Sequence, residues 1–441
     1  MKKYNSYKDS GIEWLGDTPA HWSNYRIDWI TAIVRGNTGL KKDKLLDIGE
    51  YVALQYGKTY KVDEVNNTFN FFVNSEYFKR NQTVHRGDTI LISTSETIED
   101  LGHSCFYNRN DLGLLGGEQI LLKPKTKLIN EKYLYYFSKI FCGELRKYAT
   151  GLKVFRFNTD DLKKVFIAIP PLSEQTTIAQ YLDTKTQTID KKINLLTKKA
   201  DYYKELRKSI INDAVCKGLD KNVKLKESGI EWIGKIPEHW EVKRIKDIYS
   251  SLAGGTPSTK EKEYWIGEIP WIPSGKVQNN IVVPEVVEDF ISVKALKESS
   301  TKIAKSNSIL IALTGATCSN IGYLTFDTTI NQSIVALLPK RKLETKYYFY
   351  FLISGSEKIR TYMTGGAQGG INQEDVKFLK VLLPSLEEQT AIANYLDEKT
   401  QKIDAIVSNI GKQIDTLKEL RKTLINDVVT GKIKVITNGN K

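Results

Sequence analysis

The chain has 441 residues, more than one ordinary hydrophobic core accommodates, so we expect two or three domains. Its composition, 41% hydrophobic and 27% charged with no run of 18 apolar residues, is typical of a globular protein and excludes a membrane span. Lys and Arg number 65 against 52 Asp and Glu, and the formal charge of +13 favours a polyanionic partner such as nucleic acid.

The N-terminus and the cysteines indicate the cellular location and whether a metal site is expected. The first residues include lysines with no apolar stretch behind them, so we expect no secretory signal and a cytoplasmic location. The cysteines lack the paired spacing of zinc sites and are expected to be reduced; they are Cys105, Cys142, Cys216 and Cys318. We therefore predict no metal site.

The first element in chain order is a segment rich in Trp, Gly and Pro that occurs twice. Residues 7–27 return at 225–245 with 12 of 21 positions identical, and we call these segments the Trp repeats. Self-similarity at a long fixed period indicates an internal duplication. His21 and His239 recur in the Trp repeats, each before a Trp, and we expect each ring to pack against its own domain with its polar tip bonded locally.

A globular region follows each Trp repeat, at about 28–168 and 246–382. Tyr-rich runs at 132–148 and 346–362 predict helices, while short β-branched runs bounded by Gly, Pro or Asn predict strands at 88–93, 119–124, 308–313 and 333–339. The mixture predicts an α+β protein whose two α/β domains each have their own core. Because the globular regions resemble each other much less than their flanks do, we expect one fold with two different surfaces.

A long helix is predicted at the end of each half. Residues 170–190 recur at 384–404 with 15 of 21 positions identical. A heptad seam follows in each copy, formed by Leu182, Ile189, Leu196, Tyr203 and Ile210 and by Leu396, Ile403, Ile410, Leu417 and Leu424. We place a second, poorer seam at Ile178, Lys185, Lys192, Lys199 and Leu206 and at Ile392, Lys399, Ile406, Gln413 and Leu420. The two helices are expected to form an antiparallel coiled coil, which gives the chain a pseudo-twofold internal repeat.

These elements divide the chain into four predicted parts. Residues 1–168 hold the first Trp repeat and globular domain, and residues 169–218 form the first long helix. Residues 219–382 hold a short charged linker, the second Trp repeat and the second globular domain. Residues 383–441 form the second long helix and a tail.

Motifs for catalysis are missing from the sequence. The only Pro-Pro, at 170–171, is not in an Asn/Asp-Pro-Pro-aromatic context, the Gly-rich run 364–370 lacks the GxGxxG spacing, and no GxxxxGK[ST] occurs. Asp183-Thr-Lys185 and Asp397-Glu-Lys399 match the tail of a metal-dependent nuclease motif, but both fall inside the long helices. We interpret them as solvated helix faces and predict no catalytic residue.

Basic and amide side chains in predicted loops are candidates for contact with DNA. Such side chains read base edges and phosphates, and neighbouring Gly residues let the backbone approach. In the first domain the candidates are Arg35, Asn37, Lys41, Lys42, Lys153 and Arg156. In the second domain they are Gly255, Thr256, Ser258, Lys260, Gln368 and Asn372. The alternative for each segment is an ordinary structural loop, and for Gly254-Gly-Thr-Pro-Ser a plain turn.

The repeated motifs resemble those of a known family. Gly-Ile-Glu-Trp-x-Gly-x-x-Pro-x-His-Trp at the start of each half, and Pro-x-Leu-x-Glu-Gln-x-x-Ile-Ala-x-Tyr-Leu-Asp at the start of each helix, are similar to the repeats of the specificity (S) subunit of type I restriction-modification systems. The resemblance covers essentially the whole chain. The first domain departs from the family pattern, with Gly36-Asn-Thr-Gly where a Gly-Thr-Pro turn is usual.

The resemblance implies a non-catalytic subunit that selects DNA sequences. Each globular domain would be a target-recognition domain reading one half of a bipartite asymmetric site, and the helices would fix the spacer. Two methyltransferase (M) subunits would dock on the repeats and carry S-adenosylmethionine, and restriction (R) subunits would bring ATP and Mg; this chain itself would bind no cofactor. The repeated positions that we assign to partner docking are Glu174, Gln175, Lys185, Glu388, Gln389 and Lys399.

Two other classes of function stay open at this point. One is a self-sufficient enzyme that modifies or cleaves DNA, and the other is a coiled-coil adaptor without a DNA role. The target sequence, the spacer length and the presence of a restriction subunit do not follow from this sequence.

Overall fold

The computed structural model of the chain describes residues 2–125, 127–151, 153–362 and 369–436. Its contacts divide the chain into two compact units, unit 1 with residues 1–196 and 412–441 and unit 2 with residues 197–411. Each unit holds one Trp repeat, one globular region and part of both long helices, α5 (Leu172–Lys217) and α11 (Leu386–Val429). The helices therefore belong to the cores of the two units rather than forming a compact unit of their own.

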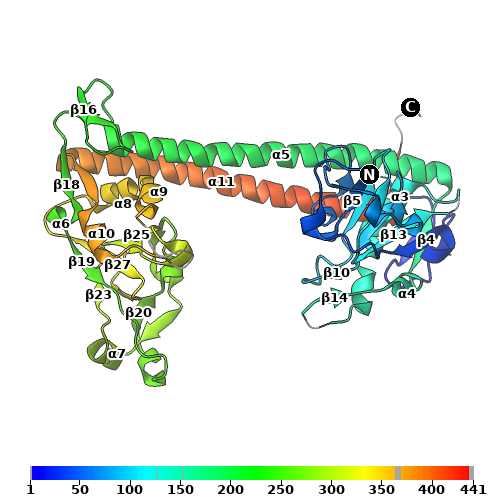
Figure 1. Cartoon of the computed structure of the whole chain (residues 1–441), viewed down its shortest axis with the longest axis horizontal. Helices are drawn as coiled ribbons and strands as arrows, with labels where there is room; N and C mark the ends of the chain where they lie inside the picture. Colours follow the sequence, from blue (N-terminus) through cyan, green and yellow to red (C-terminus); the bar gives the residue numbers. More distant parts are fainter. Residues whose placement is uncertain (1, 126, 152, 363–368, 437–441) are drawn as a thin grey trace. The chain divides into compact units, whose positions relative to one another are not determined.

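Unit 1 is built on two sheets (Figure 1). A five-stranded sheet has the order β4-β13-β9-β11-β6, with bounds Thr31–Arg35, Gln119–Pro124, Thr89–Ile92, Ser104–Tyr107 and Glu64–Val65. A four-stranded sheet has the order β7-β5-β12-β8, with bounds Phe72–Val73, Tyr51–Leu54, Gly113–Leu115 and Thr83–Val84. The Trp repeat adds β1 (Tyr7–Asp9), β2 (Asp17–Pro19) and β3 (Ser23–Arg26), and β3 pairs with β15 (Phe166–Ile169) just before α5.

Unit 2 repeats the strand order of both large sheets, but the two-stranded sheet of β10 (Thr94–Ser95) and β14 (Phe155–Arg156) in unit 1 corresponds there to a single bridge between Thr314 and Gly370. Its five-stranded sheet has the order β19-β27-β24-β25-β21, with bounds Tyr249–Ala253, Ile334–Pro339, Ile309–Ala312, Ile321–Leu324 and Asn280–Val282. Its four-stranded sheet has the order β22-β20-β26-β23, with bounds Asp289–Ile291, Ile269–Ile272, Thr328–Ile330 and Ile303–Ala304. Strands β16 (Leu225–Glu227), β17 (Lys235–Pro237), β18 (Glu241–Arg244) and β28 (Lys380–Leu383) match the Trp-repeat strands of unit 1. The α+β class and the duplicated fold are confirmed.

The four predicted strands are all present, as β9, β13, β24 and β27. They form the centre of the five-stranded sheets, where both faces are covered, and the side chains of β9 and β24 are fully buried over four residues each. A β-branched run that is buried on both faces suits a central strand, because branched side chains pack well on a pleated surface. A short apolar run is therefore enough to predict a central strand.

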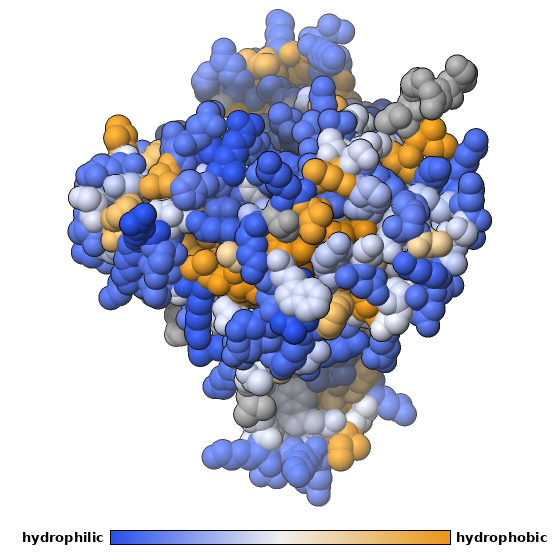
Figure 2. Space-filling view, turned by 90° about the vertical axis from the view of Figure 1, so that its right-hand side faces the viewer, coloured by the Kyte–Doolittle hydropathy of each residue, from blue (hydrophilic) through white to orange (hydrophobic). Residues whose placement is uncertain are grey.

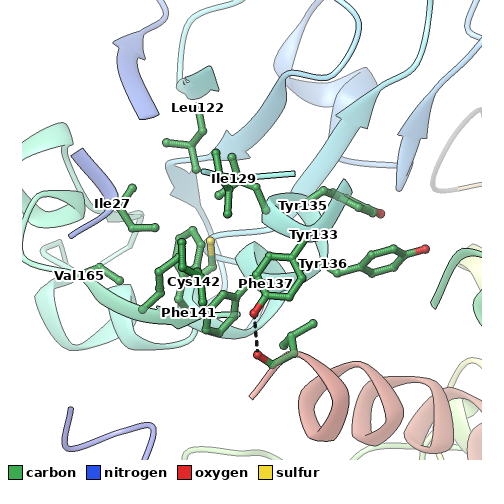
Figure 3. Packing of buried hydrophobic residues seen from close by; sticks show 14 of the residues in the cluster. Ile27, Leu122, Ile129, Tyr133, Tyr135, Tyr136, Phe137, Phe141, Cys142 and Val165 are labelled. Carbon is green, nitrogen blue, oxygen red and sulfur yellow. Dashed lines mark hydrogen bonds between the residues drawn. The ribbon is translucent and has the colours of Figure 1, made fainter. Parts of the chain in front are cut away.

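The Tyr-rich runs form shorter helices than predicted, because the first ends at Phe141 before a 3-10 helix at Glu144–Tyr148 and the second ends at Ser354 before α9 (Ser356–Arg360). The first helix of each run joins its sheet to both long helices. In unit 1, α3 (Glu131–Phe141) buries Tyr133, Phe137 and Phe141 in the core, and the Tyr133 hydroxyl donates to the Val429 carbonyl of α11 at 3.2 Å (Figure 3). In unit 2, α8 (Thr345–Ser354) places Tyr347 so that its hydroxyl donates to the Val215 carbonyl of α5 at 3.0 Å. Burial raises the pKa of both phenols, so they stay protonated as donors.

A second tyrosine on each of these helices bonds to the other long helix. The Tyr136 hydroxyl donates to Asp183 of α5 at 2.7 Å, and the Tyr350 hydroxyl donates to Asp397 of α11 at the same distance. The sequence pattern predicts that these two aspartates lie on solvated helix faces. They do lie in helices, but their carboxylates are half-buried acceptors for tyrosine, so the interpretation as solvated residues is wrong.

The first predicted heptad seam is confirmed, whereas the second lies one residue further along. Positions such as Leu182, Leu396 and Ile410 are buried, and the complementary seam runs through Thr186, Ile193, Ala200, Arg207 and Ala214 and through Thr400, Val407, Ile414, Arg421 and Val428. Lys185, Lys192 and Lys199 are exposed. In a heptad the spacings between successive seam residues alternate between three and four. The predicted second seam lies three residues after each position of the first seam, whereas the observed one lies four residues after it.

The surface and the thiols agree with the composition. On the face seen in Figure 2, hydrophilic residues predominate and apolar residues appear as patches between them. All four cysteines are free and buried, as expected for reduced core residues. None of the described helices combines the length and apolar character that crossing a membrane requires.

Candidate nucleic-acid interface

Each Trp repeat is fastened to the start of a long helix by a glutamate. In unit 1, His21 Nε2 lies 2.8 Å from a Glu174 oxygen, and in unit 2, His239 Nε2 lies 2.8 Å from a Glu388 oxygen. The neighbouring Trp of each repeat donates its indole N–H to the same carboxylate, at 3.4 and 3.0 Å. The polar tip of each histidine is bonded as predicted, but its partner is a carboxylate of the long helix that is distant in sequence, and both imidazoles are exposed rather than packed on the globular region. Both glutamates, which we had assigned to partner docking, have this intrachain role.

Glu388 makes the stability of unit 2 depend on pH. Burial would raise the pKa of Glu388, but hydrogen bonds from Trp240, His239 and Ser385 outweigh burial and lower the pKa to about 2. In the unfolded chain the Glu388 carboxyl titrates near pH 4.5. Ionised Glu388 therefore stabilises the fold above this pH, and the contribution is lost as the pH falls towards 2.

We expect Glu388→Gln to melt at a lower temperature than the wild type at pH 7, because the variant lacks the charged acceptor. The difference between the two proteins should shrink as the pH is lowered from about 5 to about 3, because Glu388 of the unfolded wild type takes up a proton in this range while the folded protein still holds it ionised. Thermal melts followed by circular dichroism at several pH values check this. A difference that stays constant over this range would contradict it.

The glutamines beside these glutamates are fully buried. Gln175 accepts from the Asn130 N–H at 2.7 Å and donates to the Leu128 and Pro170 carbonyls at 2.7 and 2.8 Å. Gln389 accepts from the Glu344 N–H at 3.0 Å and donates to a carbonyl at 2.9 Å. These amides join the long helix to the globular region inside each unit, so the docking role predicted for them does not fit their burial.

The remaining two docking candidates form an equivalent pair. Lys185 Nζ lies 5.7 Å from the centre of the Tyr181 ring, and Lys399 Nζ lies 5.5 Å from the centre of the Tyr395 ring. Lys185 is exposed and Lys399 is partly exposed, and neither forms an ion pair among the described residues. The long helices therefore present the same Tyr–Lys arrangement twice.

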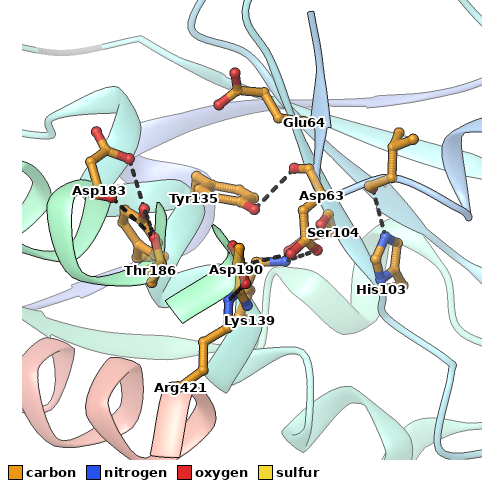
Figure 4. Close-up of polar contacts among 12 residues, drawn as sticks. Asp63, Glu64, His103, Ser104, Tyr135, Lys139, Asp183, Thr186, Asp190 and Arg421 are labelled. Carbon is orange, nitrogen blue, oxygen red and sulfur yellow. Dashed lines mark hydrogen bonds and ion pairs between the residues drawn. The ribbon is translucent and has the colours of Figure 1, made fainter. Parts of the chain in front are cut away.

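An arginine of each long helix pairs with an aspartate of the other. Arg421 Nε lies 3.0 Å from Asp190, and Arg207 Nε lies 3.0 Å from Asp404. The shift of 214 residues that relates the helices converts one pair into the other, as in an isologous interface. In unit 1 the Arg421 guanidinium also contacts Asp63 at 2.7 Å (Figure 4).

Asp63 makes the arginine pair of unit 1 stronger than its counterpart. Burial would raise the pKa of Asp63, but Lys139, at 2.8 Å, and Arg421 lower it below its usual range. We expect Arg421→Ala to reduce the free energy of unfolding by about 1–3 kcal/mol after solvent screening, and Arg207→Ala by about 0.5–1 kcal/mol. Calorimetric melting of both variants beside the wild type measures this, and equal shifts in melting temperature would contradict it.

The strand ends of unit 1 meet in a hydrogen-bonded arrangement that we call the strand-end frame. It consists of residues 35–37, 93–95, 116–119 and 155–157. The Gly36 N–H donates to the Gln119 carbonyl at 2.9 Å, and the Ser93 N–H donates to the Glu118 carbonyl at 3.1 Å. Thr94 of β10 (Thr94–Ser95) is the strand partner of Arg156 in β14 (Phe155–Arg156).

Unit 2 has the same frame at residues 253–255, 313–315, 331–334 and 369–371. The Gly254 N–H donates to the Ile334 carbonyl at 3.1 Å, the Leu313 N–H donates to the Ser333 carbonyl at 2.8 Å, and Thr314 forms a bridge with Gly370. A Cβ added to Gly36 or Gly254 would lie within 2.0 Å of a carbonyl oxygen of the opposite segment, so both frames need glycine there.

The side chains on the two frames differ. Arg35, Glu118 and Arg156 of unit 1 are exposed, and neither arginine forms an ion pair among the described residues. The equivalent residues of unit 2 are Ala253, Ser333 and Gly370. Two frames that share these backbone hydrogen bonds thus carry chemically different side chains along their edges, and the unit 1 frame includes both Arg35 and Arg156.

Of the other candidates in unit 1, Asn37 belongs to the strand-end frame and three lysines lie outside it. Lys79 Nζ donates to the Asn37 carbonyl at 2.7 Å and approaches its side-chain oxygen at 3.2 Å. Lys41, Lys42 and Lys153 are exposed and form no ion pair within the described residues. These three amines are therefore accessible to an anionic partner.

In unit 2, several candidates have structural roles. Asn372 caps α10 (Gln373–Phe378) in a capping box with Asp375, which accounts for its amide oxygen. The Gly255 and Ser258 carbonyls accept from the indole N–H groups of Trp271 and Trp265 at 3.1 and 3.2 Å.

The Gly254-Gly-Thr-Pro-Ser turn still presents side chains to solvent. The Thr256 hydroxyl donates to Gln332, and Lys260 is exposed without an ion pair among the described residues. Gln368 lies outside the described residues. Glu118 and Gln332 do not stand out in the sequence, because a polar residue in a predicted turn is typical of any loop. Only the folded frame shows which side chains they contact.

No site for a metal emerges from the described residues. No group of three or more His, Cys, Asp or Glu in the described ranges is placed to hold an ion.

Comparison with known proteins places these features in a family. The family profile described as "Type I restriction modification DNA specificity domain" matches residues 19–198 and again residues 237–416. The type I restriction enzyme MjaVIII specificity subunit of Methanocaldococcus jannaschii is 24% identical over 430 residues, covering 95% of this chain and 94% of the relative. The EcoKI specificity subunit of Escherichia coli K12 is 23% identical over 434 residues, covering 95% and 90%.

A solved structure shares the fold. A chain described under the structural basis of complex assembly and conformational transition of the type I R-M system aligns with a TM-score of 0.71 over 94% of this chain and 99% of that chain. The sequence identity is 15%, so this likeness concerns the fold alone.

Proposed function

This chain belongs to the type I restriction modification DNA specificity family, and from that premise we propose that its two units read the two halves of one divided DNA site. As a specificity subunit it is a non-catalytic component of a type I restriction-modification complex. The observation that carries the proposal is the duplicated strand-end frame with different side chains on it. Two unequal half-sites need two unequal reading surfaces, and a shared frame supplies them on one fold.

Two copies of a methyltransferase subunit are the proposed protein partners. Two identical partners need two equivalent surfaces, and the Tyr181–Lys185 and Tyr395–Lys399 pairs are equivalent and at least partly exposed. Glu174, Gln175, Glu388 and Gln389 support this surface from inside by fixing the starts of the helices.

The chemistry would then belong to the partners. The methyltransferase subunits would carry S-adenosylmethionine and extrude the target adenine from the duplex, and restriction subunits would use ATP and Mg. We propose that the complex works in the cytoplasm on double-stranded DNA. The positive charge of +13 would contribute a salt-dependent, sequence-independent part of the binding.

Transfer of labelled methyl groups to DNA tests this assignment. The purified chain, the methyltransferase subunit and the two together are incubated with S-adenosylmethionine and genomic DNA. We expect sequence-selective methylation only in the combined reaction. Methylation or nicking by this chain alone would favour the self-sufficient enzyme. Failure of the chain, with and without partners, to bind DNA at low salt would favour the adaptor.

A further inference from the structure

Glu118 is held in an unusual conformation on the strand-end frame of unit 1. Its φ is 61°, in the left-handed region that a residue with a Cβ adopts only at a cost. The Thr94 hydroxyl donates to its carboxylate, and the Ser93 N–H donates to its carbonyl at 3.1 Å. Ser93 therefore fixes the main chain of Glu118 and Thr94 fixes its side chain, and together they orient an exposed carboxylate.

The frame around this carboxylate also carries two exposed arginines, as a surface that binds nucleic acid would. Arg156 is the strand partner of Thr94, the residue that holds Glu118, and Arg35 is the strand partner of Ile120, two residues further along β13. Glu118 nevertheless forms no ion pair with any described residue. The carboxylates of Glu96, Asp100 and Glu118 all raise the pKa of Tyr56, and of these only Glu118 belongs to the frame.

A carboxylate is a selective group on such a surface. Ionised, it only accepts hydrogen bonds, and DNA phosphates, which are also anionic acceptors, repel it. Among the base edges of the major groove, the 4-amino group of cytosine is the donor that Glu and Asp pair with, whereas arginines favour guanine and phosphate. In unit 2 the equivalent residue is Ser333, so the frame itself does not require a carboxylate.

We infer that Glu118 reads a cytosine in the half-site bound by unit 1, accepting a hydrogen bond from the cytosine 4-amino group. The inference rests on the proposed function and adds a base and a residue to it. Glu118 acts as a specificity determinant on an edge whose arginines contact guanine or phosphate.

The first test is the methylated sequence of cells that express the methyltransferase partner with wild-type chain, Glu118→Gln or Glu96→Gln. We expect Glu118→Gln to relax selection at one C·G pair of one half-site by about 10- to 100-fold. The other half-site and the spacer should not change, and Glu96→Gln, which removes a nearby exposed charge outside the frame, should leave the whole sequence unchanged.

The second test measures the contact directly and works even if the variant methylates poorly. Binding of the assembled complex is titrated with duplexes in which each cytosine of the half-site is replaced in turn by 2-pyrimidinone, which lacks the 4-amino group. One replacement should weaken binding by the wild type about 10-fold or more and have little effect on Glu118→Ala, because the alanine side chain has no acceptor for that amino group.

The two claims fail in different ways. If no split sequence is methylated with the wild-type chain, the proposed function is wrong. If a split sequence is found but Glu118→Gln leaves it intact, or if every 2-pyrimidinone replacement affects both proteins equally, only the role of Glu118 is overturned. Relaxation at an A·T pair would likewise overturn the assignment to cytosine.

Discussion

Exchanging the recognition region of unit 1 for that of another specificity subunit will change one half of the methylated sequence and leave the other half intact. The proposed reading surface of unit 1, including its strand-end frame, lies within residues 28–168 and is built on unit 1 sheets alone. We expect complete replacement of one half-site, because every base contact proposed for unit 1 comes from the exchanged residues. The methylated sequence of expressing cells is the measurement.

The structure sharpens how this exchange should be made. β15 (Phe166–Ile169) pairs with β3 of the Trp repeat, so the exchange should end at residue 164 and leave that pair intact. The donor should have Tyr at the positions of Tyr133 and Tyr136, whose hydroxyls bond to the long helices. A matched exchange of residues 246–378 in unit 2 should change the opposite half. If either exchange alters both halves, the assignment of one half-site to each unit is wrong.

Lengthening both long helices will lengthen the unspecified spacer while both half-sites stay the same. α5 and α11 are each one uninterrupted helix with residues in both units. One heptad inserted after Leu196 and one after Ile410 keep the packing seam and add about 10 Å to each helix at roughly 1.5 Å per residue. We expect a spacer about three base pairs longer, read from the methylated sequence.

A second insertion separates distance from rotation along the DNA. Three added base pairs turn the half-sites by roughly 100° about the DNA axis, whereas three heptads add about 31 Å, close to one turn of roughly 34 Å. The three-heptad variant should therefore bind with a spacer longer by nine or ten base pairs and with little twisting. A spacer that stays constant in both variants would show that the helices do not set it.

The sequence was most informative where one physical signal determines the structure. The buried β-branched runs of β9 and β24 predicted central strands, and the heptad of Leu396, Ile403 and Ile410 predicted the main helix seam. The Trp repeats predicted the duplication. In each case an apolar residue packs against other apolar residues, and this does not depend on which of them the fold supplies. The local pattern and the final structure therefore agree.

Polar residues were harder to assign because their roles depend on what the fold brings to them. Glu174 and Gln175 recur in both halves and look like a docking surface in sequence, but Gln175 is fully buried and Glu174 holds His21. The repetition indicates that these residues matter in both halves, but it does not distinguish a buried structural role from an exposed docking role. Glu118 carried no signal beyond its turn, since its role depends on Thr94 and Arg156, which are distant in sequence.

The central claim is that two units of one chain select two halves of one DNA site for a partner that methylates it. Single-molecule sequencing that detects N6-methyladenine, in cells with the methyltransferase partner and with or without this chain, tests it most directly. We expect one methylated sequence made of two short defined halves separated by a fixed undefined spacer, present only with the chain. Methylation that persists without the chain, or a single continuous site, would contradict the account.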